Sequence, residues 1–262
     1  MNEKNVKNQT LQLINNRRTI RAYSSKPLSQ EEIDTIIQGA LRAPTAGNLM
    51  MYSIIQVNDQ KLKDKLVKTC DNQPHIAKAP LVLLFLADMQ RWWDYFSVSK
   101  VEEKCKVIGR EFKTPQESDL FLACCDTLIA AQNSVIAAEA IGIGSCYIGD
   151  IMENFEIHRE MFKLPQWVFP ITLLCYGRPK GDKNKIPLTT RFPKEYIVFT
   201  NQYSRLSANN FTDMLKDDPR KISTKEAENL GQEFYFGKLG SDFTLEMRRS
   251  VKVALKEWLK KG

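Results

Sequence analysis

Apolar and polar positions in the first part of the chain repeat with the spacing of helices. Residues 10–15 form the end of a first predicted helix. Ser29 and Glu32 stand at the two positions of a capping box, and apolar residues follow them at helical spacing, so a second helix is predicted to about Arg42. Pro44 ends this helix, because the residue before a proline disfavours helical backbone.

Other apolar stretches predict the strands of a sheet. Residues 53–57 form a first strand, and residues 79–88 are apolar almost throughout, which indicates a strand buried on both faces. Residues 167–176 have the same buried character. Residues 145–150 are predicted as a short strand or a turn, and residues 195–199 as a last strand-like piece.

Residues 118–141 are apolar on every side of a helix, which predicts a helix that is buried all round. Such a helix of about 24 residues is roughly 36 Å long. The core of a monomer of this size and a helical dimer interface are both able to bury it. Gly142 and Gly144 end it.

Four aromatic residues stand close together between the second strand and this long helix. They are Trp92, Trp93, Tyr95 and Phe96. Because side chains on one element point in different directions, these four do not all face inward, and some are expected to cover a pocket or a partner subunit. The charged segment that follows, to about Lys113, is expected to be mobile.

The end of the chain reads differently from its beginning. Residues 180–185 form a basic, loose linker. After a polar stretch comes an amphipathic helix, whose apolar positions are Met247, Val251, Leu255, Trp258 and Leu259. The chain contains no internal repeat and no low-complexity segment.

Composition fits a globular protein of one or two domains. The chain has 262 residues, of which 43% are hydrophobic and 26% charged, enough for a substantial core. No apolar run of membrane-spanning length is apparent, and the first eight residues are polar, without an apolar signal region. No membrane association is expected, and a cytoplasmic location follows by default.

The cysteines and histidines do not predict a metal site. The six cysteines are scattered and form no CxxC pair, so reduced and mostly buried thiols are expected. His75 and His158 are the only histidines and lie far apart in sequence. Without zinc spacing, each is interpreted as a surface residue or a satisfied one rather than a ligand.

The formal charge of +7 favours anionic partners, and the chain has one dense cationic cluster. Arg17, Arg18, Thr19 and Arg21 place three guanidinium groups and a hydroxyl within five residues. Arginine offers a planar fork of donors suited to phosphate, whereas the plain alternative is a solvated basic turn. A recognition helix or basic–aromatic stripe for nucleic acid is absent, so a small phosphorylated cofactor is the favoured partner.

Common cofactor and nucleophile motifs are missing. Gly142 and Gly144 follow a helix rather than a strand, and the third glycine of a dinucleotide fingerprint is not there. The sequence contains no phosphate-cradling Gly-Lys-Ser/Thr loop and no nucleophile elbow, which argues against a Ser-His-Asp hydrolase.

Four ordered motifs resemble the nitroreductase family of FMN enzymes. They are residues 17–23 (RRTIRAY), residues 43–48 (APTAGN), residues 137–149, and residues 174–179 (LCYGRP). The similarity covers roughly residues 10–200. It implies an α+β fold with three layers, in which helices flank a central mixed, mostly antiparallel sheet, in an intertwined homodimer. Residues 1–200 would be the FMN-binding core, and residues 201–262 a C-terminal extension of the same domain that packs on the dimer.

The resemblance implies roles for the cationic cluster. Arg17 and Thr19 would bind the FMN phosphate, joined by Arg191 from far along the chain. Arg21 would reach the pyrimidine side of the isoalloxazine, where a cation stabilises the negative charge of reduced flavin. Arg18 would either contact the ribityl chain or be solvated.

Other contacts to FMN follow from the same resemblance. Tyr147, Ile148 and Gly149 would lie along the flavin, with a backbone N–H directed at N5, and glycine allows backbone to approach closely. Gln73 would contact the edge of the ring. The remaining contacts would come from the partner subunit, through Pro44, Thr45, Ala46 and Asn48.

Three positions depart from the family pattern. Met50 stands where glutamine is common and Tyr52 where tryptophan is common, and both are interpreted as core-filling residues. Thr189 stands where a lysine is frequent, so one positive charge near the phosphate is missing.

The long region past Tyr196 indicates the group of NADPH-dependent flavin reductases and oxygen-insensitive nitroreductases. The expected activity is ping-pong hydride transfer from NADPH (or NADH) through FMN to nitroaromatics, quinones or free flavin, with no catalytic side chain required. The alternatives are a flavin-binding or redox-sensing protein with little turnover, and a basic nucleic-acid-binding protein. The sequence does not separate NADPH from NADH.

Overall fold

The computed structural model describes residues 8–260 and divides the chain into two compact units. The first unit is Met1–Lys185 with Leu245–Gly262, and the second is Ile186–Thr244. Compactness alone does not test where folding domains begin and end, so the predicted division at residue 200 stays a prediction.

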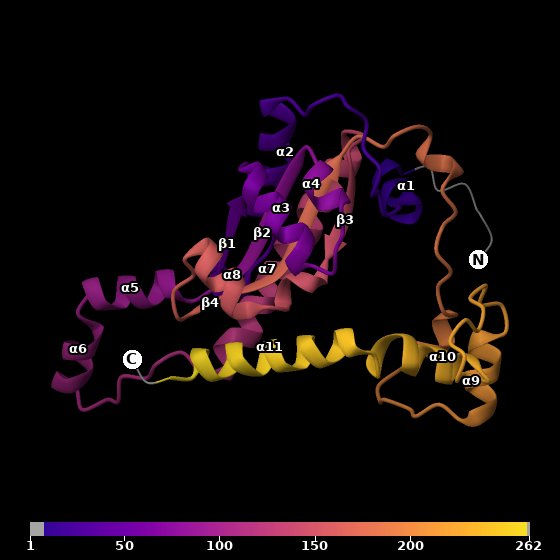
Figure 1. Cartoon of the computed structure of the whole chain (residues 1–262). Helices are drawn as coiled ribbons and strands as arrows, with labels where there is room; N and C mark the ends of the chain where they lie inside the picture. The colour runs from indigo at the N-terminus through magenta and orange to yellow at the C-terminus, as the bar shows by residue number, and fades with distance from the viewer. Residues whose placement is uncertain (1–7, 261–262) are drawn as a thin grey trace. The chain divides into compact units, whose positions relative to one another are not determined.

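The first unit is built on a four-stranded sheet with the order β1-β2-β4-β3 (Figure 1). The strands are β1 (Tyr52–Gln56), β2 (Leu81–Asp88), β3 (Gly144–Ile148) and β4 (Val168–Gly177). Every neighbouring pair is antiparallel. The strands β1 and β3 are therefore the two opposite edges of the sheet.

Both faces of the central strands are buried, as the apolar runs predicted. Leu83 and Phe85 of β2 pack towards α2 and α7, whereas Val82 and Leu84 pack towards α3, α4 and α8. These layers confirm the predicted α+β arrangement of a sheet between helices (Figure 1). The bounds are α2 (Gln30–Leu41), α3 (Gln60–Thr69), α4 (His75–Lys78), α7 (Glu117–Ala140) and α8 (Phe155–Phe162).

The N-terminal helices follow the sequence prediction closely. Helix α1 spans Gln9–Asn16, and the capping box of α2 is present. The N–H of Glu32 donates to Ser29 Oγ at 3.2 Å, and the N–H of Ser29 donates to a carboxylate oxygen of Glu32 at 2.8 Å. This box fixes where the loop after the arginine cluster ends.

Helix α7 buries one face in the protomer and leaves another apolar face exposed. Its buried residues contact α2 and the sheet, as those of a core helix do. The opposite face carries Phe121, Leu122, Leu128 and Ile129, which are 72%, 48%, 47% and 43% exposed. The protomer alone therefore does not bury α7 all round.

By length and composition α7 is also the one stretch in the described residues apolar enough to cross a membrane, with 44% of that window buried. The sequence expectation that no such run exists is wrong on this point. The contacts of α7 with α2 and the sheet account for its apolar character in the protomer.

Helices α5 (Gln90–Val98) and α6 (Val101–Val107) carry the aromatic group and the charged segment after it. Trp92 and Trp93 both pack against the core, and the ring centroid of Trp93 is 4.5 Å from that of Trp167. Tyr95 is 61% exposed. The four aromatics thus point in different directions, as their spacing required, and much of the segment expected to be mobile is helical.

The predicted amphipathic helix is α11 (Asp242–Trp258). Its last turn is fixed to the first unit, because Trp258 is 2% exposed and its carbonyl accepts the indole N–H of Trp167 at 3.0 Å. The indole N–H of Trp258 in turn donates to the carbonyl of Gln116 at 3.1 Å.

The second unit contains α9 (Ala208–Leu215), α10 (Leu230–Phe234) and a π-helix, Tyr235–Leu239. The strand predicted at residues 195–199 is wrong: Lys194–Tyr196 is a 3₁₀ turn, and the carbonyl of Lys194 accepts from the N–H groups of Ile197 and Val198. Ile197 is 60% and Val198 56% exposed. An apolar alternation without a neighbouring strand to pair with does not form a strand.

Candidate functional site

The arginine cluster lies along the free edge of β3. Thr19 forms a parallel bridge with Ser145, and the N–H of Ile20 donates to the carbonyl of Ser145 at 2.9 Å. Gly144 makes this approach possible, because an added Cβ would stand 2.3 Å from Ile20 Cγ1. This bridge is parallel, whereas the neighbouring strands of the sheet pair in antiparallel fashion.

Two guanidinium groups stand beside β3 without a carboxylate partner. Neither Arg17 nor Arg21 forms an ion pair within residues 8–260. Burial raises the pKa of Tyr147 to about 12, and the Arg17 charge opposes that rise. Burial also raises the pKa of Cys146, against the effect of Arg21 and then Arg17. Both positive charges are therefore available to an anionic ligand along this strand.

Beyond Ser145, the outer edge of β3 pairs with no further strand within residues 8–260. Since the carbonyl of Ser145 points outward and backbone groups alternate with a period of two, the N–H of Tyr147 points to the same free edge. An added Cβ at Gly149 would meet no atom within 4 Å, so the space in front of that residue is open. Ile148 is 1% exposed and faces the core instead.

Gln73 reaches this edge from the turn after α3. Its amide Nε2 donates to the carboxylate of Asp150 at 2.7 Å and to the carbonyl of Cys70 at 3.1 Å. The amide nitrogen is therefore occupied within the protein, which leaves the amide oxygen for a ligand. Asp150 directly follows Gly149, so Gln73 lies near the predicted flavin segment, and its contact with the ring edge stays a prediction.

Arg18 and Arg191 each donate hydrogen bonds to residues close to them in sequence. Arg18 Nη1 donates to the carbonyl of Asn16 at 2.7 Å. Arg191 lies in the second unit, where its Nη1 donates to Thr189 Oγ1 at 2.6 Å. It also lines a cavity of about 500 Å³ together with Asp213 and Asp217. Its predicted meeting with Arg17 stays a prediction.

The segment predicted to serve a partner subunit's flavin is a strained loop before β1. After Pro44 and Thr45, residues Ala46–Asn48 form a 3₁₀ turn. Gly47 and Asn48 both have φ of 56°, and Met50 has φ of 49°. Two non-glycine residues in left-handed backbone within three positions need outside support, because each costs of order 1 kcal/mol.

Asp126 of α7 supplies that support, and it is not among the site residues predicted from the sequence. Its carboxylate accepts from the N–H of Ala46 at 2.9 Å and from the N–H of Met51 at 3.2 Å. Asp126 is 2% exposed. Trp92 adds an indole N–H to the carbonyl of Leu49 at 2.7 Å. A polar residue on the core face of an apolar helix was the available signal.

Within one protomer the two halves of the predicted site lie on opposite edges of the sheet. The loop with Ala46 and Asn48 leads into β1, whereas Arg17, Thr19 and Tyr147 lie at β3. Three strand spacings separate these edges, about 14 Å. One protomer therefore brings together the Arg17–Gly149 half and leaves the Pro44–Asn48 half apart.

The β3 half fits the chemistry of FMN. A phosphate needs unpaired cationic donors, which Arg17 supplies next to the hydroxyl of Thr19. A planar heterocycle needs open space and a backbone N–H at its edge, which the Tyr147–Gly149 segment supplies.

Of the two departures from the family pattern near β1, Tyr52 is confirmed as core-filling, since it is 3% exposed and its hydroxyl donates to the carbonyl of Ala40.

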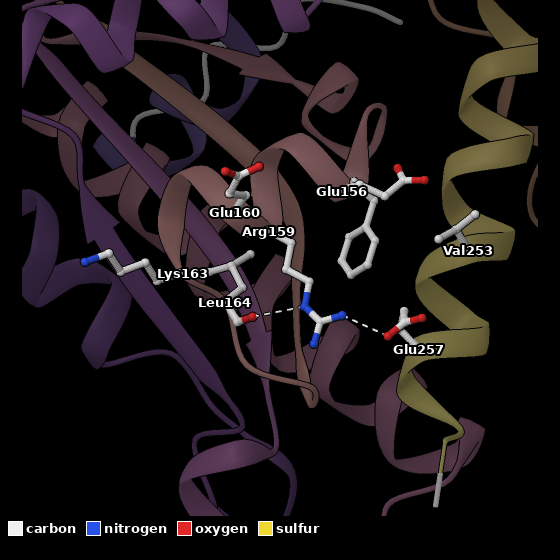
Figure 2. Close-up of a pocket in the computed structure, with 8 residues that line it drawn as sticks. Glu156, Arg159, Glu160, Lys163, Leu164, Val253 and Glu257 are labelled. Atoms are coloured by element: carbon white, nitrogen blue, oxygen red, sulfur yellow. Dashed lines mark hydrogen bonds and ion pairs between the residues drawn. The ribbon is translucent and has the colours of Figure 1, made fainter. Parts of the chain in front are cut away.

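Another cavity lies away from these residues, between α8 and α11 (Figure 2). It measures about 550 Å³ and includes Phe155, Lys163 and Val253. Arg159 lies along it and pairs with Glu257 at 2.9 Å, as Figure 2 shows. None of the predicted FMN residues lines this cavity, so its size is no guide to the cofactor.

The histidines differ from each other. His158 is buried and satisfied, with Nδ1 2.9 Å from the carbonyl of Ile151 and Nε2 2.8 Å from Thr69 Oγ1. His75 is buried too, but its Nε2 has no partner among residues 8–260, so the interpretation of a surface or satisfied residue is wrong for it. His75 is the first residue of the short helix α4, and sequence spacing does not reveal that it is buried.

The cysteines are free, but fewer are buried than expected. Cys70, Cys146 and Cys175 are buried, while Cys125 is exposed on α7. No group of three or more histidine, cysteine or acidic side chains suited to a metal occurs in the part of the chain that the structure describes.

Glu153 is a buried acid just after the Gly149 turn. Burial, and then the negative charges of Asp150, Asp71 and Glu246, raise its pKa to about 7. It is 6% exposed, and one carboxylate oxygen has no partner in residues 8–260. The folded state therefore holds this proton more tightly than the unfolded chain does.

We expect Glu153→Gln to stabilise the protein at pH 8 by about 1 to 2 kcal/mol, after discounting for solvent screening. Since the folded pKa is raised, the stability linked to the neutral acid is complete below about pH 4.5 and is lost as pH rises through 7. Urea unfolding at pH 5 and pH 8 measures this, with exposed Glu160→Gln as control. An equal change at both pH values would contradict the prediction.

Comparison with known proteins matches these observations. The family model described as Nitroreductase family matches residues 14–178. The chain is 34% identical over 198 residues to FMN reductase (NADPH) of Bacillus subtilis, covering 75% of each chain. It is 32% identical over 197 residues to oxygen-insensitive NADPH nitroreductase of Salmonella typhimurium, again 75% of each. The solved structure of nitroreductase A from Vibrio parahaemolyticus superposes with a TM-score of 0.77 at 26% identity, covering 97% of this chain and 99% of that one.

Proposed function

Because the chain belongs to the nitroreductase family, we propose that it is an FMN-dependent NAD(P)H oxidoreductase. It transfers hydride from NADPH through FMN to nitroaromatics, quinones or free flavin. The observation that carries this proposal is the pair of guanidinium groups of Arg17 and Arg21, without carboxylate partners in the described residues, beside the free edge of β3.

The side chains of this protein bind and orient rather than react. FMN, when bound, supplies the hydride chemistry. Arg17 and Thr19 hold its phosphate, and Arg21 lies at the pyrimidine side, where a positive charge stabilises the reduced ring. A backbone N–H of the Tyr147–Gly149 segment faces N5, and Gln73 presents its amide oxygen to the ring edge. Arg18 contacts the ribityl chain or remains solvated.

The site is completed by a second copy of the chain in a homodimer. One protomer separates the Pro44–Asn48 loop from Arg17 by the width of the sheet. The exposed apolar face of α7 supports such an interface, because Phe121, Leu128 and Ile129 lie on one side of the helix. Pro44, Thr45, Ala46 and Asn48 then contact the FMN held by Arg17 of the other protomer. Arg191 adds a second charge at the phosphate.

The proposal places the enzyme in the cytoplasm as a soluble protein, where NADPH and small aromatic acceptors are at hand. Nucleic acid is not a partner in it. The basic side chains that give the chain its charge of +7 attract the phosphates of NADPH.

The colour of the purified protein tests the proposed function. We expect a yellow protein whose flavin absorbance bleaches when NADPH is added and returns with a quinone or nitroaromatic. A yellow protein that does not bleach would indicate a flavin-binding protein with little turnover. A colourless one that FMN does not reconstitute would contradict both. Stopped-flow reduction by NADPH and by NADH separates the two reductants.

We expect Leu128→Glu to convert the dimer to monomers and to lower FMN occupancy at least tenfold. A charge in the centre of an apolar interface has no partner and costs several kcal/mol to bury. Sedimentation measures the assembly and absorbance the bound flavin. The control is Ile157→Glu on α8, where a 49% exposed isoleucine lies away from α7. A dimeric Leu128→Glu variant with full flavin content would refute the interface.

A further inference from the structure

The C-terminal helix α11 braces the turn that follows the flavin-facing strand. This turn is η2 (Gly149–Met152). Its carbonyl at Met152 accepts the hydroxyl of Ser250 at 2.7 Å. Its neighbouring carbonyl at Ile151 is 2.9 Å from Nδ1 of His158. Side chains of α11 and α8 therefore help to hold this turn.

The helix after this turn takes its cap from α11. Asn154, the residue before α8, has a left-handed backbone with φ of 49° and makes no side-chain cap. Instead, the N–H of Phe155 donates to Ser250 Oγ at 2.9 Å, and the N–H of Asn154 donates to Glu246 Oε1 at 3.2 Å. A helix usually receives these bonds from its own preceding Ser, Thr, Asp or Asn. Here the cap comes from more than 90 residues away.

Ser250 links the two segments through one hydroxyl. The group accepts from the first N–H of α8 and donates to the last carbonyl of the turn, which uses both of its roles. Ser250 is 0% exposed, so water does not replace a lost bond there. A change of this hydroxyl leaves one buried N–H and one carbonyl without their partner.

The brace is itself held at both sides of Ser250. Arg249 makes a double contact with Glu156, at 2.7 and 3.0 Å. Trp258, two turns further on, is fixed by its bonds with Trp167 and Gln116. The Arg249 contact lies next to Ser250 and sets its position, whereas the bonds of Trp258 hold the far end of α11.

We propose that Ser250 is a positioning residue, which sets the placement of the Gly149 backbone against the cofactor. This inference rests on the proposed function, because Gly149 is the residue expected to face N5. In this proposal the C-terminal helix shapes the cofactor site without contacting the cofactor.

The test compares Ser250→Ala with Trp258→Phe. The two variants lie on the same helix, and Trp258→Phe also removes a buried hydrogen bond, from its indole to Gln116. In the protein without FMN, we expect amide exchange at Asp150 to Phe155 to be at least tenfold faster in Ser250→Ala than in the wild type. In Trp258→Phe we expect it to be unchanged. In the loaded protein, we expect Ser250→Ala to shift the flavin absorbance and to slow reduction by NADPH about tenfold, while Trp258→Phe matches the wild type.

Equal changes in both variants would overturn the inference, because they would report general loosening of α11. Wild-type behaviour of Ser250→Ala in exchange, spectrum and rate would overturn it too. A wild-type protein that binds no FMN would refute the proposed function instead, and the exchange comparison would still test whether Ser250 holds the turn.

Discussion

Arg17→Ala is expected to weaken FMN binding about 10- to 100-fold and to change the rate of flavin reduction less than threefold once FMN is saturating. The reason is that Arg17 is assigned to the phosphate, which does not react. A charge-assisted hydrogen bond to phosphate contributes about 1.5 to 3 kcal/mol, and each 1.4 kcal/mol is a factor of ten in affinity. Fluorescence titration of the apoprotein with FMN measures this.

Arg21→Ala is expected to do the reverse. Because the Arg21 charge is assigned to the pyrimidine side of the ring, its removal withdraws stabilisation from the reduced form. We expect reduction by NADPH to slow at least tenfold, with a change in FMN affinity of about threefold or less. Stopped-flow absorbance of the loaded enzyme measures the rate.

Arg42→Ala is the matched control for both variants, because it removes one exposed positive charge at the end of α2, away from β3. Any effect of the overall charge of +7 on NADPH or FMN then appears in all three proteins. If Arg17→Ala and Arg21→Ala reduced affinity and rate by the same factors, the separate roles would be wrong.

The elements with continuous or periodic apolar patterns were predictable from sequence. Strands β2 and β4 are apolar almost throughout because both faces are covered by helices. The capping box of α2 was visible because a cap needs only local residues. The strand predicted at residues 195–199 failed for the opposite reason, since a strand needs a partner and local alternation does not supply one.

The β3 half of the candidate site could be predicted because its members are consecutive. Arg17 to Arg21 lie on one segment and Tyr147 to Gly149 on another, so motifs identify them. The supports of the site could not be predicted in this way. Asp126 and Ser250 meet their partners across 75 to 98 residues, through single hydrogen bonds that leave no periodic trace. The order of the strands, which separates the two halves of the site, is likewise a property of the whole fold.

A second large effect is expected when Asp126, whose carboxylate supports the loop before β1, is replaced. We expect Asp126→Ala to lower stability by about 2 to 5 kcal/mol, because two backbone N–H groups at Ala46 and Met51 lose their acceptor. In a chain of this size that corresponds to a fall in Tm of roughly 5 to 15 °C. Asp126→Asn keeps the shape but turns an NH₂ towards one of these N–H groups, so about half of that loss is expected.

The same variants are expected to weaken FMN binding about tenfold in the dimer. The left-handed backbone at Asn48 and Met50 relaxes once the N–H groups on either side are released. The loop then leaves the position from which we propose that it contacts the partner subunit's cofactor. Thermal unfolding and FMN titration measure the two effects. Asp119→Ala is the control, since its carboxylate caps the first turn of the same helix through Gln116 at 2.8 Å and lies away from the loop. Loss of stability in Asp126→Ala with wild-type FMN affinity would show that the Pro44–Asn48 loop does not contact the cofactor, because its support would be gone and binding unchanged.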